Sequence, residues 1–334
     1  MKSKLGFSTP DIDVARSKIK DKLIVTPVLP LISDSWTELL PIDTRVFVKL
    51  ELFQQAGSFK ARGAFLGVGG LSAEQKNRGV IAASGGNHAL AVSWAAASAG
   101  VNAKITMPKA TDPYRIEGCK SVGAEVILCE DIADAFKVMT SLEQTEGRVM
   151  MHPFDDENMV LGAATCGAEY YEQKPEIDVF VIPVGGGGLI SGMASAIKEC
   201  NPKSKIIGVE PSGAAGFFQS FKAGKPVSLG KVDTIADSLG SPLTLPYSFS
   251  IAEKFVDKIV VVSDNDLLTS MQYYREYANI LAEPACAASL AAILGPLKEE
   301  VSGKSVGVIA CGSNISLSRY NELMKKLLIN LNLM

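Results

Sequence analysis

Short apolar segments alternate with longer helical patterns along almost the whole of this 334-residue chain. The predicted strands are Arg45–Leu50, Gly79–Ala83, Ala103–Met107, Glu125–Leu128, Val179–Pro183, Lys205–Val209, Lys258–Val262 and Ser305–Ala310. Helical patterns lie between them, for example Ala89–Ala99, Gly162–Gln173, Ile190–Glu199 and Ala287–Leu294. This strand–helix–strand rhythm predicts an α/β fold, with open, twisted, mostly parallel sheets that helices cover on both faces.

The length of the chain favours two lobes over one, because a single hydrophobic core stops growing well below this size. No Ser/Pro-rich linker or low-complexity tract divides the sequence. The chain is therefore expected to cross between the lobes twice. We predict a large cofactor-binding lobe from residues 1–71 and 155–334, and a small inserted lobe from residues 72–154.

Composition excludes several function classes. With 47% hydrophobic and 21% charged residues, the chain has an ordinary globular composition. A net charge of −3 gives no electrostatic case for binding nucleic acid or an anionic membrane. Six cysteines are scattered without CxxC or metal-type spacing, which indicates reduced thiols and no zinc site. The segment Met1–Phe7 lacks the apolar core of a signal peptide, and no stretch is long enough to span a bilayer, so a cytoplasmic location is expected.

A run of four glycines, Gly185–Gly188, directly follows the predicted strand Val179–Pro183 and opens a helical pattern. Backbone N–H groups that no side chain covers, together with the positive end of the helix, form a cradle for phosphate. A flexible turn is the alternative, because glycine clusters also mark loops. Ser191 breaks the GxGxxG pattern and no Lys-Ser/Thr pair follows, so the expected ligand is phosphorylated but is not a nucleotide.

Lys60 follows a strand pattern and lies among Phe59, Ala61 and Phe65. Apolar surroundings remove water from an ammonium group, lower its pKa and make the neutral amine accessible. A neutral amine forms a Schiff base with a carbonyl compound. The alternative is that Lys60 extends its charged end into solvent, as many lysines beside apolar residues do.

A second glycine-containing loop, Ser84-Gly85-Gly86-Asn87-His88, also lies between a predicted strand and a predicted helix. Its amides and the Ser84 and Asn87 side chains are suited to a carboxylate at a helix N-terminus. Helix capping is the alternative for Asn87 and is the favoured interpretation of His88. No GxSxG elbow accompanies either histidine of the chain, which argues against a Ser-His-Asp hydrolase.

Six motifs, taken together, resemble those of the pyridoxal-phosphate enzymes of the tryptophan-synthase β fold (fold type II). Within that group the chain is most similar to the serine/threonine dehydratases and serine racemase. The resemblance extends from about Thr26 to Arg319. The motifs are GSFKARGA (57–64), SGGNHA (84–89), HPFDD (152–156), PVGGGG (183–188), EPACAA (283–288) and CGSN (311–314).

The resemblance implies a role for each matching residue. Lys60 would hold pyridoxal phosphate as a Schiff base and then move the proton at the substrate Cα, with Phe59 packed beside the ring. The cofactor phosphate would lie on the amides of Gly185, Gly186, Gly187, Gly188 and Leu189. Asn87 would bind the phenolic oxygen, and Cys311 would face the pyridine nitrogen. Ser84, Gly85, Asn87 and His88 would bind the substrate carboxylate, and Ser84 would also be catalytic.

Cys311 has a chemical consequence in this position. A thiol is neutral near pH 7 and is a weak hydrogen-bond donor, so negative charge would spread poorly into the ring. Prompt loss of a β-hydroxyl group would then be favoured over transamination. Without the resemblance, Cys311 would be interpreted as a small core residue.

Three departures or ambiguities bear on function. Gly85 stands where serine racemases have the serine that moves a proton on the second face of Cα, which argues against racemisation. Gly216 stands where some relatives have an aspartate that binds a divalent cation, so no metal is expected and Glu210 is left as a solvated or capping carboxylate. Glu283 lies near the cofactor or a cation in relatives, but a surface salt bridge would give the same sequence.

The sequence therefore predicts a pyridoxal-phosphate-dependent ammonia-lyase that converts a β-hydroxy amino acid, L-threonine or L-serine, to a 2-oxo acid and ammonia. Relatives imply a homo-oligomer, a dimer or a tetramer. A serine- or aspartate-type racemase and a 3-hydroxyaspartate dehydratase are alternatives, and Arg115 is a candidate cation for a diacid substrate. A non-catalytic sensor on the same scaffold is the least favoured alternative.

Overall fold

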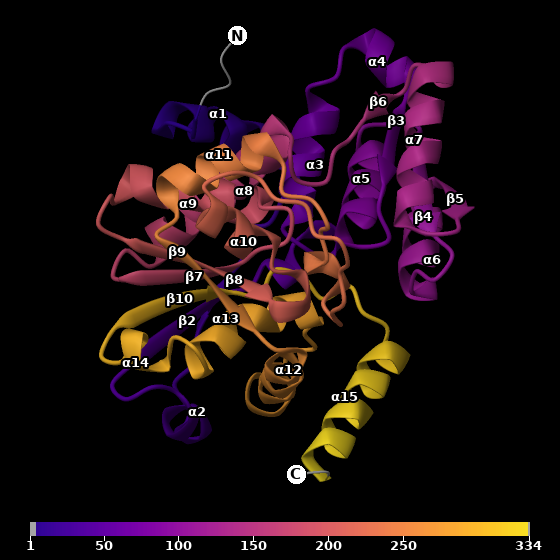
Figure 1. Cartoon of the computed structure of the whole chain (residues 1–334). Helices are drawn as coiled ribbons and strands as arrows, with labels where there is room; N and C mark the ends of the chain where they lie inside the picture. Colours follow the sequence, from indigo (N-terminus) through magenta and orange to yellow (C-terminus); the bar gives the residue numbers. More distant parts are fainter. Residues whose placement is uncertain (1–4, 333–334) are drawn as a thin grey trace.

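Two separate, mainly parallel β-sheets organise the molecule, which is a computed structural model that describes residues 5–332 (Figure 1). The larger sheet has the strand order β1-β2-β10-β7-β8-β9 and is parallel except where β1 pairs with β2. The smaller sheet has the order β5-β4-β3-β6 and is parallel throughout. The first four residues of Met1–Phe7, and with them part of the signal-peptide prediction, lie outside the described residues.

The strand bounds are as follows: β1 (Val28–Pro30), β2 (Arg45–Lys49), β3 (Val80–Ala83), β4 (Ala103–Pro108), β5 (Glu125–Cys129), β6 (Val149–Met150), β7 (Val179–Pro183), β8 (Lys205–Pro211), β9 (Lys258–Val262) and β10 (Ser305–Ile309). The α-helices are α1 (Thr9–Ile19), α2 (Asp34–Leu39), α3 (Lys60–Gly69), α4 (Ala73–Arg78), α5 (Asn87–Ser98), α6 (Pro113–Ser121), α7 (Ile132–Glu146), α8 (Glu157–Gln173), α9 (Gly188–Cys200), α10 (Gly216–Ala223), α11 (Pro246–Phe255), α12 (Asp264–Ala278), α13 (Pro284–Leu294), α14 (Lys298–Val301) and α15 (Leu317–Asn332). Four short 3-10 helices complete the set: η1 (Glu51–Phe53), η2 (Gln55–Gly57), η3 (Ser212–Ala214) and η4 (Asp237–Leu239).

All eight predicted strands are present, each within two residues of its expected bounds, and the predicted α/β class is confirmed. Two strands were missed. β1 runs antiparallel at the edge of the larger sheet and ends at Pro30, and a proline is tolerated there because an edge strand does not need every N–H for pairing. β6 has only two residues, and a strand of this length is too short to show the alternation of apolar and polar residues that identifies a strand in a sequence.

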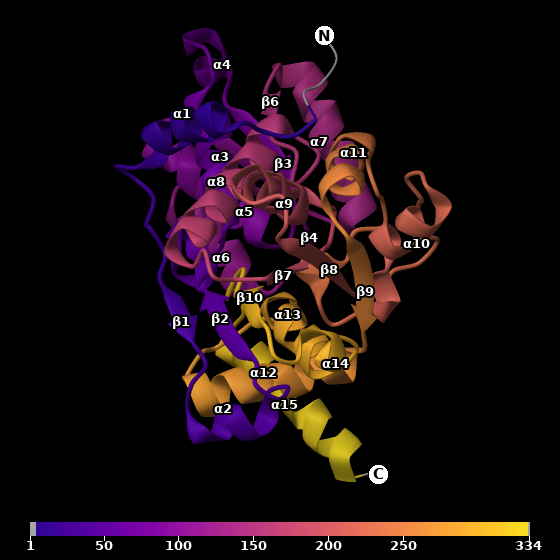
Figure 2. The ribbon, with the colours of Figure 1, turned by 90° about the vertical axis from the view of Figure 1, so that its left-hand side faces the viewer.

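The larger sheet lies between two helical layers, with α8, α9 and α11 on one face and α12, α13 and α14 on the other (Figures 1 and 2). All five residues of β7 and all five of β10 are buried, as expected for central parallel strands covered on both faces. This core is the largest in the molecule and runs from Leu31 to Leu327. Parallel strands bring their carboxyl ends to one edge of a sheet, which is where α/β proteins place ligands.

Every strand of the smaller sheet lies between Val80 and Met150, and every strand of the larger sheet lies outside that range. This division agrees with an inserted small lobe, and the boundaries 1–71 plus 155–334 and 72–154 remain a proposal. Across residues 5–332, no helix combines the length and apolar character that a membrane crossing requires.

Candidate active site

A cavity of about 530 Å³ opens where the carboxyl ends of β3 and β4 face those of β7 and β10. Its walls therefore come from both sheets. The cavity brings together all the site residues predicted from sequence, from four separate segments of the chain. They are Phe59, Lys60, Ser84, Gly85, Asn87, His88, Gly185, Gly186, Gly187, Gly188, Leu189 and Cys311.

Lys60 is the first residue of α3 and projects into this cavity. Its Nζ donates a hydrogen bond to the carbonyl of Pro153 and lies 5.0 Å from the centre of the Phe59 ring. Burial lowers the pKa of Lys60 to about 8, against a smaller opposing influence of Cys311. A substantial fraction of this amine is therefore neutral in mildly alkaline solution, as a nucleophilic amine requires.

A buried ionic network, which the sequence analysis did not single out, holds the first turn of α3. Arg62 donates to Glu51 at 2.8 and 2.7 Å and to Glu169 at 3.0 Å. Lys49 donates to the same Glu169 carboxylate at 2.5 Å. All four side chains are buried, so removing one would leave an unpaired buried charge. The network fixes α3, and with it Lys60, against η1 and α8.

The glycine run forms a tight turn in which a side chain would collide. Gly187 has φ +90°, and a Cβ there would lie 2.1 Å from Cζ of Phe217. A Cβ on Gly186 would lie 2.2 Å from the Phe154 ring. Packing of this kind argues against the flexible-turn alternative.

The amides of the same turn are free to bind a ligand. Within residues 5–332, those of Gly185 to Gly188 find no hydrogen-bond acceptor, and α9 continues from Gly188 for 13 residues. Free amides at the start of a helix are well suited to a phosphate group.

In the loop after β3, the structure contradicts the predicted capping roles of Asn87 and His88. Gly86 occupies the N-cap position of α5, and no side chain caps this helix, so the capping interpretation is wrong for both Asn87 and His88. His88 instead donates from Nε2 to the carbonyl of Met151 at 2.8 Å. Burial, with a further contribution from the nearby Lys60 charge, lowers the pKa of His88 to about 3, so the imidazole is neutral. Ser84 Oγ accepts a hydrogen bond from the Gly86 amide at 3.1 Å.

Asn87 is held at both ends of its amide group. Its Nδ2 donates to Glu283 Oε1 at 2.6 Å, and its Oδ1 accepts from Asn314 Nδ2 at 2.6 Å. Glu283 is completely buried and lines the cavity, so the surface salt bridge considered for it is wrong. Burial raises the pKa of Glu283, and Arg115 partly offsets this.

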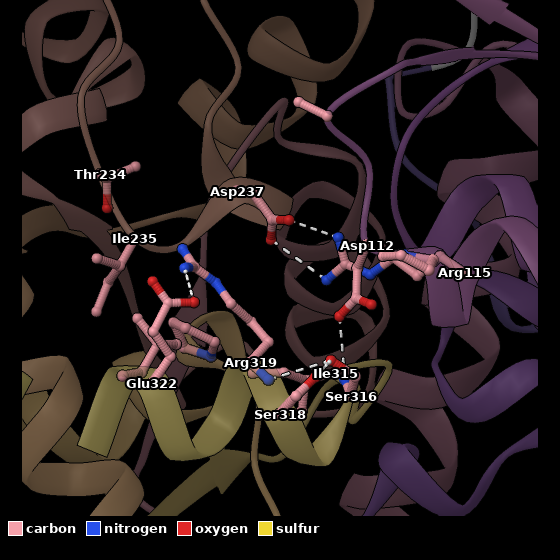
Figure 3. Close-up of a pocket in the computed structure, with 14 residues that line it drawn as sticks. Asp112, Arg115, Thr234, Ile235, Asp237, Ile315, Ser316, Ser318, Arg319 and Glu322 are labelled. Carbon is pink, nitrogen blue, oxygen red and sulfur yellow. Dashed lines mark hydrogen bonds and ion pairs between the residues drawn. The ribbon is translucent and has the colours of Figure 1, made fainter. Parts of the chain in front are cut away.

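Arg115 lines the cavity, but carboxylates already compensate its charge. Its guanidinium donates to Asp237 at 2.5 Å and lies 3.6 Å from Glu283 Oε2. It also donates to the carbonyls of Gly85 and Asn314. Figure 3 shows Arg115 and Asp237 paired at the border of a second cavity, of about 550 Å³, that extends toward Arg319 and Glu322. Arg115 is thus a link between the two lobes and has no free charge to offer.

Thr111 is a cavity residue that the sequence analysis missed. A Cβ added to Gly85 would lie 2.6 Å from Thr111 Oγ1, so the threonine hydroxyl lies where a side chain at position 85 would begin. Thr111 belongs to the turn between β4 and α6, with its amide bonded to the carbonyl of Pro108. Thr111 lies close to Gly85 only because of the way that turn packs. No local sequence pattern indicates this proximity.

Cys311 follows β10 and is buried, and burial raises the pKa of its thiol well above the ordinary value. The thiol is therefore neutral, as expected.

Glu210 accepts hydrogen bonds from the amides of Phe217 at 2.9 Å and Phe218 at 2.7 Å, so it caps α10, as one of its two interpretations proposed. Among the described residues, no three His, Cys, Asp or Glu side chains converge as metal ligands.

Comparison with known proteins identifies the family. The model of the family described as "Pyridoxal-phosphate dependent enzyme" matches residues 19–312. The chain is 41% identical over 306 residues to a phenylserine dehydratase of Ralstonia pickettii, covering 91% of this chain and 92% of that protein. It is 36% identical over 285 residues to an L-threonine ammonia-lyase of Thermotoga maritima, covering 85% and 71% respectively. Maize serine racemase has a similar structure, with a TM-score of 0.88, 33% identity, and coverage of 98% of this chain and 99% of that one.

The chain belongs to the pyridoxal-phosphate-dependent enzyme family, and its fold is that of fold type II. The cofactor predicted from the sequence is thereby confirmed.

Proposed function

We propose that the chain catalyses the dehydration of a β-hydroxy amino acid to a 2-oxo acid and ammonia, with L-threonine and L-serine among its substrates. One observation carries the proposal: Lys60 places an amine with a pKa of about 8 in the same cavity as the free amides of the glycine turn. Two of the relatives named above are a phenylserine dehydratase and an L-threonine ammonia-lyase, which supports elimination at the β-carbon.

The residues present fit pyridoxal phosphate. The amides of Gly185 to Gly188 and Leu189 would hold its phosphate. Lys60 would bond to its aldehyde carbon, and Phe59 would pack against one face of its ring. The Asn87 amide would hydrogen-bond the phenolic oxygen, and the neutral Cys311 thiol would face the pyridine nitrogen. When bound, the cofactor stabilises the negative charge that develops at the substrate Cα as its proton leaves.

The chain supplies binding groups and a base. Ser84 and the amides of the loop through His88 would hold the substrate carboxylate at the start of α5. Lys60 Nζ, once free and neutral, would take the Cα proton, and its place inside the cavity, where it donates to the Pro153 carbonyl, supports this role. The β-hydroxyl group would leave as water with the proton that Lys60 took from Cα. The released enamine would tautomerise to an imine, and water would hydrolyse the imine to the 2-oxo acid and ammonia.

One alternative is weakened by geometry. A diacid such as 3-hydroxyaspartate needs a free cation, and the Arg115 charge is already compensated by Asp237 and Glu283. A non-catalytic sensor that retains the cofactor would use the same amine of Lys60, so only the turnover assay below distinguishes it.

Racemisation is the second candidate, because Thr111 places a hydroxyl group beside Gly85. Chiral analysis of recovered L-serine would decide it. If Thr111 supplies the proton, Thr111→Val abolishes formation of D-serine while ammonia release continues.

Borohydride reduction of the holoenzyme followed by peptide mapping tests the proposed function. We expect a phosphopyridoxyl group on the peptide that carries Lys60, and no ammonia release by Lys60→Ala with any β-hydroxy amino acid. A colourless protein that stays colourless with added cofactor, or a wild-type holoenzyme that releases no ammonia from any such substrate, would overturn the proposal.

We also infer that the chain forms a homo-oligomer, a dimer or a tetramer, in the cytoplasm. Ile24, Val25 and Phe53 are 43%, 68% and 53% exposed. They belong to adjoining segments, because the side chain of Gln54 hydrogen-bonds the backbone of Ile24 in both directions. An apolar patch of this kind suits a second copy of the chain. Sedimentation equilibrium tests the inference, and a monomer at micromolar concentration would contradict it.

A further inference from the structure

One wall of the active-site cavity is apolar and comes from the first two turns of α7. Ile132 and Phe136 both line the cavity, and residues four apart on a helix share a face. Pro108, at the end of β4, lines the cavity as well. None of these three side chains is among the residues proposed to hold the cofactor or the substrate carboxylate.

Apolar side chains of the larger lobe also line the cavity. Val232, Leu239 and Pro242, on the segment between β8 and α11, line the same cavity. Ile132 is nevertheless 40% exposed. When an apolar ligand group covers apolar surface at the wall of a cavity, that surface is removed from water, and this burial stabilises the complex.

This wall lies on the substrate side of the cavity. The proposed phosphate site follows β7 of the larger sheet, whereas α7 packs on β3 and β4 of the smaller sheet (Figure 1). Phe136 packs against the cluster that contains Ala83, the residue directly before the Ser84–His88 loop. A substrate whose carboxylate is held by that loop would therefore bind close to the first two turns of α7.

The charges around the cavity favour an uncharged β-substituent. Arg115 is the only arginine among the described residues that line the cavity, and it donates to Asp237 and to two backbone carbonyls. A second carboxylate on the substrate would have to displace Asp237 from this pair. An apolar group needs no such rearrangement.

We propose that Ile132 and Phe136 form a subsite for a bulky apolar group, aryl or branched alkyl, on the β-carbon of the substrate. This inference rests on the proposed function and specifies its substrate class. A methylene group that fits an apolar pocket is worth ~10- to 200-fold in kcat/KM. A phenyl group covering Ile132 and Phe136 should therefore raise kcat/KM at least about tenfold over the methyl group of threonine.

The test compares threo-3-phenylserine, L-threonine and L-threo-3-hydroxyaspartate as substrates of the wild-type holoenzyme, Phe136→Ala, Ile132→Ser and Leu142→Ala. Leu142 is the matched control, because it packs on the same face of the smaller sheet from α7 but does not line the cavity. We expect phenylserine to be preferred at least about tenfold, and Phe136→Ala to reduce that preference at least about fivefold. Leu142→Ala should leave the preference unchanged.

A binding measurement separates failure of this inference from failure of the proposed function. L-Phenylalanine and L-alanine lack the β-hydroxyl group, and their binding is followed through the absorption spectrum of the cofactor. L-Phenylalanine should bind the wild-type holoenzyme more tightly than L-alanine, and Phe136→Ala should remove the difference. A preference for threonine or hydroxyaspartate, equal effects of Phe136→Ala and Leu142→Ala, or equal binding of the two analogues would overturn the subsite. If the holoenzyme releases ammonia from none of the substrates but still binds L-phenylalanine more tightly than L-alanine, only the proposed function is overturned.

Discussion

Asn87 Nδ2 donates a 2.6 Å hydrogen bond to Glu283 Oε1, which joins residues 196 positions apart in the chain. Asn87 begins α5 of the smaller lobe, and Glu283 directly precedes α13 of the larger lobe. Because Asn314 donates to the other end of the Asn87 amide, the orientation of that amide is fixed. The proposed ligand of the cofactor's phenolic oxygen is therefore set by two residues that do not themselves belong to its loop.

Replacing Glu283 tests this arrangement. Glu283→Ala leaves Asn87 Nδ2 without its closest partner in a buried site, at a cost of about 1–3 kcal/mol in the free energy of unfolding. We also expect weaker cofactor binding, measured by titration of the apoprotein. Glu283→Gln keeps an acceptor and should be milder, and the exposed Glu253→Ala serves as the control. Equal stability of the Glu283→Ala and Glu253→Ala proteins would contradict the prediction.

The pKa of Lys60 should govern loading of the cofactor. Only the neutral amine attacks an aldehyde, and burial lowers the pKa of Lys60 from 10.5 to about 8. The rate at which apoprotein condenses with pyridoxal phosphate should therefore rise with pH and level off above about 8. Stopped-flow absorbance measures the rate, with N-acetyl-lysine amide as the unburied reference. A midpoint near that of the reference would refute the prediction.

His88 should make the protein sensitive to acid. Its pKa is lowered from 6.5 to about 3 by burial, so below pH 6.5 the unfolded chain binds a proton that the folded chain does not. Both states are neutral at this residue above pH 6.5, and stability is lost as pH falls from 6.5 toward 3. His88 alone should account for about 2 kcal/mol between pH 7 and pH 5.

Urea unfolding of wild type and His88→Gln at both pH values measures this loss. The variant should be less stable at pH 7, because it disturbs a buried contact, but its stability should change less with pH. The same loss in both proteins between pH 7 and pH 5 would show that His88 is not responsible.

Gly187 should be required for cofactor binding as well as for folding. Gly187→Ala combines an unfavourable φ of +90° with a Cβ 2.1 Å from Phe217. Gly303→Ala is the matched control, because Gly303 has φ +74° but nothing lies within 4 Å of an added Cβ. We expect a small loss of stability in the control, a larger one in Gly187→Ala, and a loss of cofactor affinity in Gly187→Ala alone. Normal cofactor affinity of Gly187→Ala would argue against a phosphate cradle at this turn.

Several features of the molecule were readable from the sequence because their physical signal is local. A buried parallel strand is a short apolar run, so β7 and β9 were predicted with their observed bounds. Lys60, Gly185–Gly188 and Cys311 each follow or adjoin such a strand, and the ends of parallel strands converge, so their meeting in one cavity was also predictable.

Only the tertiary structure decided the partners of those residues. Nothing near Asn87 in the sequence points to Glu283, and nothing near Arg115 points to Asp237. The capping interpretation of His88 was wrong because burial against Met151 gave the imidazole a distant backbone partner instead of a local one. The apolar wall of Ile132 and Phe136 was not foreseen, since a helix face on one lobe becomes part of a site only through the packing of the other lobe. Sequence patterns report preferences over a few residues, whereas charge compensation and cavity shape depend on contacts between segments a hundred or more residues apart.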